Sequence, residues 1–178
     1  MQNETVIAGF GGQGVLFAGK VLAYTALEAD LDVTWFPSYG PEMRGGTANC
    51  TVIFSDEEIG SPQVMSPTSA IVLNQPSLDK YENNIGSGGY LIVNTSMTNR
   101  EVKRKDINAT CLPATEIAEE IGDKRLTNLV MLGALIKISN FFTKEQLENA
   151  LKKILKGKKE HMIENNIVAL KKGFEFSA

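Results

Sequence analysis

The sequence predicts a single α/β domain over residues 1–178, with a three-layer, Rossmann-like architecture. Three observations predict it. A short apolar run leads into a glycine cluster and then into a helical segment, two further apolar runs have the length of buried strands, and helical periodicity occupies the last third. We therefore expect a mostly parallel sheet with an added β-hairpin and a helical C-terminal third. The length of 178 residues suits one well-filled core.

The first three elements form one unit. Residues 5–8 are a short apolar run before the glycine cluster, which is typical of a buried parallel strand that ends in a turn. Residues 15–29 place apolar side chains on one face at helical spacing. Residues 31–36 are rich in β-formers. Together they predict a strand–helix–strand unit, which is nearly always right-handed.

The middle of the chain adds further strands. Residues 48–54 alternate as a strand does, and the acidic residues 56–58 are expected to turn the chain toward Ile59, which would give the added hairpin. Two buried strands are predicted at residues 71–73 and 90–93. The remaining predicted elements are a short helix around 78–83, a weaker strand at 109–112, and helices at 115–121, 126–138, 143–155 and 161–170. Thr143 and Gln146 predict a capping box at the start of the helix at 143–155.

Composition excludes several classes of protein. The net charge is -3, with 18 basic and 21 acidic side chains, so nothing global attracts nucleic acid or an anionic membrane. We expect a cytoplasmic protein, since neither a signal peptide nor a membrane-spanning run is recognisable. Cys50 and Cys111 cannot hold an iron–sulfur cluster alone and are expected to be buried. The single histidine, His161, has no ligand cluster near it, so no metal site is expected.

The glycine cluster is the first candidate site. It follows the first strand and opens the first helix, where glycines permit positive φ and free N–H groups point toward a ligand. It predicts a site for phosphate or another anion at Gly9, Gly11, Gly12, Gln13 and Gly14. The alternative is a tight turn that serves only strand–helix packing.

Two nucleotide-binding interpretations are disfavoured. A dinucleotide site needs an acidic residue at the end of the second strand, but that strand runs into Phe36 and Pro37, while Asp30 and Asp32 lie at its beginning. A near-match to the ATP-binding P-loop has Val21 where Ser or Thr would bind magnesium.

An irregular loop after the second strand is the second candidate site. Ligands of open α/β sheets bind at the carboxyl ends of the strands, and Arg44 is suited to forking onto a carboxylate or phosphate. An exposed or inter-subunit ion pair is the alternative for Arg44. The residues expected to line a shared cleft or a subunit interface are Ser38, Tyr39, Gly40, Glu42, Arg44, Gly45 and Gly46.

Several separated motifs, in order, resemble one known family. They are GFGGQGV, PSYGPEMRGGTANCTVIFSDEEIGSP, LNQPSLDKY, and a Gly-Gly turn followed by LIVN. The chain from about Val6 through Leu155 is similar to the gamma subunit of 2-oxoacid:ferredoxin oxidoreductases, and the second motif is closest to the 2-oxoglutarate branch. The resemblance implies a pyruvate/ketoacid oxidoreductase gamma-type catalytic domain.

The resemblance also implies a reaction and an assembly. The family oxidatively decarboxylates a 2-oxoacid with coenzyme A to give acyl-CoA, CO2 and a reduced acceptor, in anaerobic metabolism. Coenzyme A would be contacted partly by this chain, whereas thiamine diphosphate, magnesium and 4Fe-4S clusters would belong to partner subunits. The implied partners are alpha and beta subunits, a delta or ferredoxin-like subunit, and ferredoxin through the complex. No general acid, base or nucleophile is assigned here, and no activity is expected of the chain alone.

Two other functions remain open. A standalone nucleotide-dependent oxidoreductase conflicts with the missing ribose-binding acid. A non-catalytic scaffold module would use the glycine turn only as architecture. If the chain is a subunit, it is expected to self-associate when isolated, or to expose an apolar patch around Trp35, Tyr39 and Met43.

Overall fold

The computed structural model describes residues 2–39, 46–157 and 159–176. Within these ranges the strands form a six-stranded sheet in the order β2-β3-β1-β4-β5-β6. β1, β4, β5 and β6 pair parallel, and β3 is antiparallel to both β1 and β2, so five of the six strands run in the same direction. The predicted fold class is therefore confirmed. The strands are β1 (Gln2–Phe10), β2 (Asp32–Tyr39), β3 (Thr47–Ser55), β4 (Ser69–Val72), β5 (Tyr90–Asn94) and β6 (Asn108–Leu112).

A hairpin is present, and the strand predicted at residues 48–54 is β3, but the partner of β3 is not the predicted one. β2 and β3 pair antiparallel along their whole length, from Asp32 opposite Ser55 to Tyr39 opposite Ala48. The predicted continuation of the hairpin at Ile59 is wrong, because residues 59–68 contain no strand. This segment includes two prolines, which cannot donate to a strand ladder. β3 also lies between β1 and β2, so the strand–helix–strand unit crosses over one strand.

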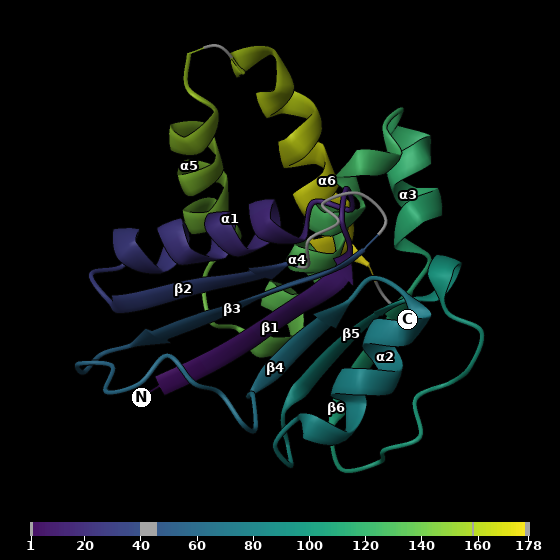
Figure 1. The fold of residues 1–178 in the computed structure, drawn as a ribbon. Coiled ribbons are helices and arrows are strands. Elements are labelled where there is room, and N and C mark those ends of the chain that lie inside the picture. Colours follow the sequence, from purple (N-terminus) through teal and green to yellow (C-terminus); the bar gives the residue numbers. More distant parts are fainter. Residues whose placement is uncertain (1, 40–45, 158, 177–178) are drawn as a thin grey trace.

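The helices cover the two faces of the sheet unequally. α1 and α4 lie against one face, and α5 and α6 pack on them from outside. α2 lies on the opposite face, in front of the sheet in Figure 1. The helices are α1 (Val15–Glu28), α2 (Gln75–Tyr81), α3 (Ala114–Ile121), α4 (Thr127–Ser139), α5 (Lys144–Leu155) and α6 (Ile163–Glu175); short 3-10 turns are η1 (Glu82–Asn84), η2 (Thr95–Met97), η3 (Lys124–Leu126) and η4 (Glu160–Met162).

Two apolar cores of different size result. The large core lies between the sheet and helices α1 and α3 to α6, and it includes Ile7, Leu22 and Leu132. The small core lies between the sheet and α2, and its buried members are Ala70, Val72, Leu78, Ile85, Leu91 and Val93.

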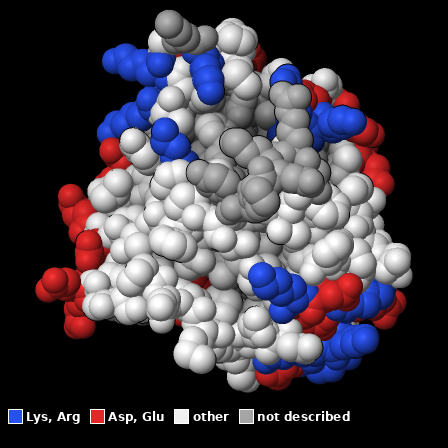
Figure 2. All heavy atoms as spheres, viewed as in Figure 1, with Lys and Arg blue, Asp and Glu red and all other residues white. Residues whose placement is uncertain are grey.

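The α2 face is only partly covered. Its outer part, near β2 and β3, carries few charged side chains (Figure 2). Phe36 is opposite Thr51 in the β2–β3 register, on this face, and is 57% exposed. Antiparallel strands tolerate one open face better than parallel strands do, so the open part coincides with the hairpin.

The capping box predicted for α5 and the burial predicted for the two cysteines have different outcomes. The capping box of α5 is confirmed: Gln146 N–H donates to the Thr143 hydroxyl at 3.2 Å, and Thr143 N–H donates to the Gln146 side chain at 2.8 Å. Cys50 is buried as predicted, and burial raises its pKa to about 12, so it stays a neutral thiol. The prediction for Cys111 is wrong. Cys111 is exposed, on the edge strand β6.

Within the described ranges, every helix is too short or too polar to cross a membrane.

Candidate functional site

The glycine turn lies at the switch point of the sheet, where the chain leads away from β1 toward one edge and from β4 toward the other edge. α1 begins after β1 and α2 begins after β4, and the two helices start on opposite faces of neighbouring strands. In open α/β sheets, ligands bind outside the carboxyl ends of the strands at such a point. The structure therefore places the predicted turn, residues 11–14, where a ligand site is expected.

Two glycines give the turn its shape. Gly12 has φ +99° and Gly14 has φ +75°, both in the left-handed region that glycine favours. A Cβ added to Gly12 would meet no atom of the described residues within 4 Å. Gly14 is the N-cap of α1 and offers no side chain to cap the helix. The first turn of α1 has no acidic residue, so its positive dipole end is not neutralised locally.

The backbone N–H groups of the turn divide into two sets. Gly11 N–H donates to the Gly46 carbonyl at 2.8 Å, and Gln13 N–H donates to the Phe10 carbonyl at 3.1 Å. These two predicted anion donors are therefore used inside the protein. The N–H groups of Gly12 and Gly14 donate to no group within the described ranges. An anion at this turn would be held by Gly12, Gly14 and the start of α1.

The Gln13 side chain ties the turn to the neighbouring strand. Its Oε1 accepts the Phe10 N–H at 2.6 Å and the Asn74 Nδ2 at 3.2 Å. Asn74 in turn accepts the Ser77 N–H at 3.0 Å and so caps α2. A Cβ on Gly9 would lie 2.6 Å from Gln13 Oε1, so glycine at position 9 leaves room for this side chain. Gln13 thus positions the site through its side chain.

Asn128, the second residue of α4, holds the turn from behind. Its Nδ2 donates to the Gly14 carbonyl at 2.9 Å, and its side chain is almost completely buried. Sequence reasoning missed both Asn74 and Asn128. Asn74 had a signal, because it follows a buried strand and precedes Pro76, which is typical of a helix N-cap. The sequence gives no such signal for Asn128, because the carbonyl that its side chain bonds belongs to Gly14, 114 residues away.

Two small hollows flank the turn. One has a volume of about 70 Å³ and lies toward α2; the other has a volume of about 300 Å³ and lies toward α1. Ligand sites usually measure about 300–1,000 Å³, so neither hollow, as the described residues line it, encloses a large ligand. Larger hollows of about 540 and 610 Å³ lie elsewhere, near the amino ends of the strands and beside Cys111, away from the turn.

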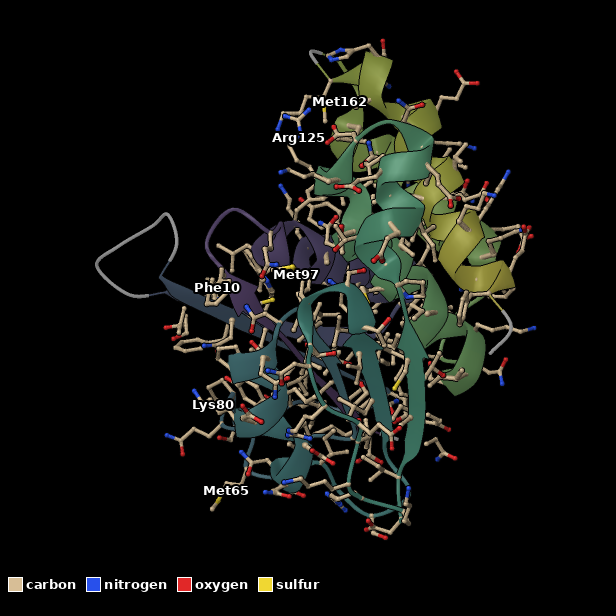
Figure 3. All side chains as sticks on the ribbon, turned by 90° about the vertical axis from the view of Figure 1, so that its right-hand side faces the viewer. Phe10, Met65, Lys80, Met97, Arg125 and Met162 are labelled. Atoms are coloured by element: carbon tan, nitrogen blue, oxygen red, sulfur yellow. The ribbon has the colours of Figure 1, made fainter. Side chains whose placement is uncertain are left out.

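Lys80 is the one cationic side chain among the described residues that line the smaller hollow. It belongs to α2 and lines that hollow together with Phe10, Asn49 and Ser77. Its Nζ lies 5.0 Å from the centre of the Tyr81 ring. Figure 3 shows Phe10 at the end of β1 and Lys80 on α2, both on the same side of the molecule.

The second candidate region is only partly described. Ser38 is exposed and lies opposite Asn49, which lines the smaller hollow. Tyr39 is the last residue of β2, and Gly46 contacts the glycine turn through Gly11. The structure thus brings the two predicted regions together at one end of the sheet. The predicted residues Gly40, Glu42, Arg44 and Gly45, and Met43 of the expected apolar patch, lie outside the described residues.

The acids considered for a dinucleotide site are at the other end of the sheet. Asp32 begins β2, and its Oδ2 accepts the Ile59 N–H at 2.9 Å. Asp30 lies just before it. The carboxyl end of β2 instead carries Pro37, Ser38 and Tyr39, so the ribose-binding acid is missing from this position. Across the described ranges no group of three or more His, Cys, Asp or Glu residues is arranged to hold a metal ion.

Comparison with known sequences gives a consistent result. The family described as pyruvate ferredoxin/flavodoxin oxidoreductase matches residues 4–176. The 2-oxoglutarate synthase subunit KorC of Methanocaldococcus jannaschii is 37% identical over 179 residues, which cover 98% of this chain and 94% of that protein. The ketoisovalerate oxidoreductase subunit VorA of Methanothermobacter thermautotrophicus is 39% identical over 172 residues, which cover 96% of this chain but 35% of the relative. The chain thus spans about a third of the length of the VorA relatives.

Solved structures share the fold. The gamma subunit of a keto/oxoacid ferredoxin oxidoreductase from Geobacter sulfurreducens superposes with a TM-score of 0.84 and 29% identity, over 98% of this chain and 95% of that chain. The 2-oxoglutarate:ferredoxin oxidoreductase of Magnetococcus marinus, solved with 2-oxoglutarate, coenzyme A and succinyl-CoA bound, superposes with a TM-score of 0.85 over 97% of this chain and 30% of that chain. At 24% identity, this second match shows the fold alone.

Proposed function

Because the chain belongs to the pyruvate ferredoxin/flavodoxin oxidoreductase family, we propose that it works as the gamma-type subunit of a cytoplasmic, multi-subunit 2-oxoacid:ferredoxin oxidoreductase. The proposed reaction is the coenzyme A-dependent oxidative decarboxylation of 2-oxoglutarate or a related 2-oxoacid to acyl-CoA and CO2, with reduction of ferredoxin. The names of the relatives, 2-oxoglutarate synthase and ketoisovalerate oxidoreductase, support this substrate class.

This chain's proposed part is to form one wall of the coenzyme A cleft. The observation that carries the proposal is the glycine turn at the switch point of the sheet, with N–H groups of Gly12 and Gly14 that are not used within the described ranges. Coenzyme A carries phosphates, and a helix start with free N–H groups favours an anion. Lys80 is the cation at the rim of the adjoining hollow. Both hollows are small as the described residues line them, and we propose that another subunit contributes to the cleft.

The cofactors that perform the redox chemistry are proposed for partner subunits. A 4Fe-4S cluster needs about four ligands, commonly cysteines. This chain has two cysteines; Cys50 is buried beside α1 and Cys111 lies on the edge strand β6, so they do not fit a cluster. The described ranges hold no group of three or more His, Cys, Asp or Glu residues that could bind a metal ion, and thiamine diphosphate with its magnesium is proposed for a partner subunit.

The partners follow from the same proposal. Alpha and beta subunits, with a delta or ferredoxin-like subunit, would supply the thiamine and the clusters. The length of the VorA relatives supports such partners, because about two thirds of those chains lies beyond the part that this chain matches. The isolated chain is expected to be colourless and inactive with 2-oxoacids. Co-purification with thiamine- and cluster-containing chains tests the assembly.

The coenzyme A cleft is tested with two matched glycine variants in the assembled enzyme. Gly12 and Gly88 both have positive φ and open space where a Cβ would be added, but Gly88 lies near the amino end of β5, far from the turn. Gly12→Ala adds a methyl group where the anion would approach. We expect the KM for coenzyme A to rise about tenfold, equivalent to about 1.4 kcal/mol, and the KM for the 2-oxoacid to stay unchanged. Gly88→Ala should change neither, and equal effects of both variants would refute the cleft.

A scaffold without ligand contacts is the second candidate, and one observation favours it. The N–H groups of Gly11 and Gln13 donate to backbone carbonyls of the same chain, as expected of a turn with a purely structural role. In that case Gly12→Ala would leave the KM for coenzyme A unchanged while the subunits still assemble.

A further inference from the structure

The outer face of α1 is the feature that the proposed function leaves unused. α1 has two charged residues, Lys20 and Glu28, in 14 positions, and α4 has one, Lys137, in 13. Helices that are apolar all round are normally buried all round. α4 obeys this rule, since every residue from position 127 to 136 is buried. α1 does not, because Tyr24 is 40% exposed and Leu27 is 52% exposed.

These exposed residues form one continuous face. Lys20, Tyr24 and Leu27 are spaced i, i+4 and i+7, so they lie on the same side of the helix. We call this surface the α1 outer face. The Lys20 Nζ lies 5.5 Å from the centre of the Tyr24 ring. Trp35 of the edge strand β2 packs beside Gly19 and is itself 39% exposed, which extends the apolar surface toward the sheet.

The other border of the α1 outer face is set by α5. Glu28 pairs with Lys153 of α5, and this ion pair fixes the Glu28 carboxylate beside the exposed face. A carboxylate has lone pairs for more than one donor, so a second cation can share it. The α1 outer face is thus an apolar strip with one cation and one anion at its margins.

The charges on this face are arranged symmetrically about Tyr24. Lys20 is four residues before Tyr24, and Glu28 is four residues after it. When two copies of α1 pack antiparallel about a two-fold axis at Tyr24, Lys20 of each copy meets Glu28 of the other. Tyr24 of each copy then faces Tyr24 of the other, and Leu27 of each copy lies opposite position 21 of the other, between its Lys20 and Tyr24. Such self-complementarity is what an isologous interface requires.

We infer that the α1 outer face is a self-association surface, and that its occupant is a second copy of this chain in a two-fold, antiparallel α1 pair. The pair buries the exposed Tyr24 and Leu27 and gives each Lys20 a carboxylate. Trp35 of each copy lies at the margin of the contact.

Sedimentation velocity of the full chain over a range of concentrations tests the inference. The wild type should show a concentration-dependent monomer–dimer equilibrium. Leu27→Asp should raise the dissociation constant by about tenfold or more, because it places a charge in the apolar strip. Met65→Asp is the matched control, since Met65 is 92% exposed and lies on the segment between β3 and β4; it should leave the dissociation constant unchanged.

A charge exchange makes the test independent of the apolar variant. Lys20→Glu alone and Glu28→Lys alone each place like charges opposite one another and should weaken the dimer. The double exchange restores opposite charges across the two-fold axis and should recover much of the affinity. Circular dichroism confirms that each variant is folded. A monomer at every concentration, or a dimer that none of these α1 variants weakens, overturns the inference.

Discussion

The two faces of the sheet are stabilised in different ways. On one face, α1 and α4 bury a large apolar core, and α6 crosses α4 at backbone distance. On the other face, α2 covers a small core, and a charged network around Glu82 holds the connection between β5 and β6. The ligand site lies where the two faces meet, at the starts of α1 and α2. The large core should therefore contribute most of the free energy of unfolding. The charged network beside the small core should make that free energy depend on pH.

The α4–α6 crossing depends on two glycines. A Cβ on Gly173 would overlap the Val130 carbonyl oxygen, and a Cβ on Gly133 would overlap the Leu170 carbonyl oxygen. Because backbone atoms cannot turn aside as side chains do, Gly173→Ala must separate the helices. We expect a loss of about 4 kcal/mol in the free energy of unfolding, and a fall of about 10 °C in Tm. Urea and thermal denaturation measure both.

Gly157→Ala is the control for this variant. Gly157 has φ +87°, and a Cβ added to it would meet no atom within 4 Å, so its substitution costs backbone strain alone, about 1 kcal/mol. A smaller effect at position 173 than at position 157 would show that the crossing is not close-packed.

On the other face, Glu82 is the centre of the charged network. Its side chain is 3% exposed, and it accepts bonds from the Arg100 guanidinium at 2.6 Å, the Lys103 N–H at 2.5 Å and the Arg104 N–H at 3.0 Å. Burial alone would raise the pKa of Glu82, but the hydrogen bonds from Arg104, Arg100 and Lys103 outweigh it and hold the pKa below its ordinary value of 4.5. Glu82→Gln should cost about 2 kcal/mol at pH 7.

The lowered pKa of Glu82 determines how the free energy of unfolding changes with pH. A lowered pKa stabilises the fold above pH 4.5, and that contribution is lost as the pH falls through the folded-state pKa. The difference between the wild type and Glu82→Gln should therefore shrink in urea titrations below pH 4.5. Glu120, an exposed glutamate on α3, serves as the control, and Glu120→Gln should stay within about 0.5 kcal/mol of the wild type. A difference that is independent of pH would exclude the ionised network. The same acid titration should leave the penalty of Gly173→Ala unchanged.

Local signals predicted the helical face well. The helix expected at residues 126–138 is α4, and the Thr143–Gln146 capping box is formed, because helical periodicity and caps are encoded over a few residues. The hairpin was harder, because strand pairing is non-local: the sequence shows that residues 48–54 form a strand but does not show that β2 is the partner. The expected end of the last helix was also early, since α6 continues to Glu175.

The residues of the candidate site were likewise predictable only where their signal is local in the sequence. The glycine turn could be recognised from its spacing alone, because positive φ and an adjoining helix start leave a local pattern. Asn128 could not, since its bond to Gly14 depends on how α4 packs against α1. The Gln13 side chain is intermediate: its residue was predicted as part of an anion site, but its contact with Asn74 depends on β4 lying next to β1.

The smallest expected change in stability is at Gln13, where the two faces join. Gln13→Ala removes the acceptor for the Phe10 N–H and for Asn74, at a cost of about 1 kcal/mol. Gln13→Glu keeps an acceptor oxygen and should therefore be the more stable variant, but it places a negative charge beside the proposed anion site. In the assembled enzyme, Gln13→Glu should raise the KM for coenzyme A at least as much as Gln13→Ala does, although it disturbs the fold less. If the KM for coenzyme A followed the loss of stability instead, the turn would act through its architecture and not by holding an anion.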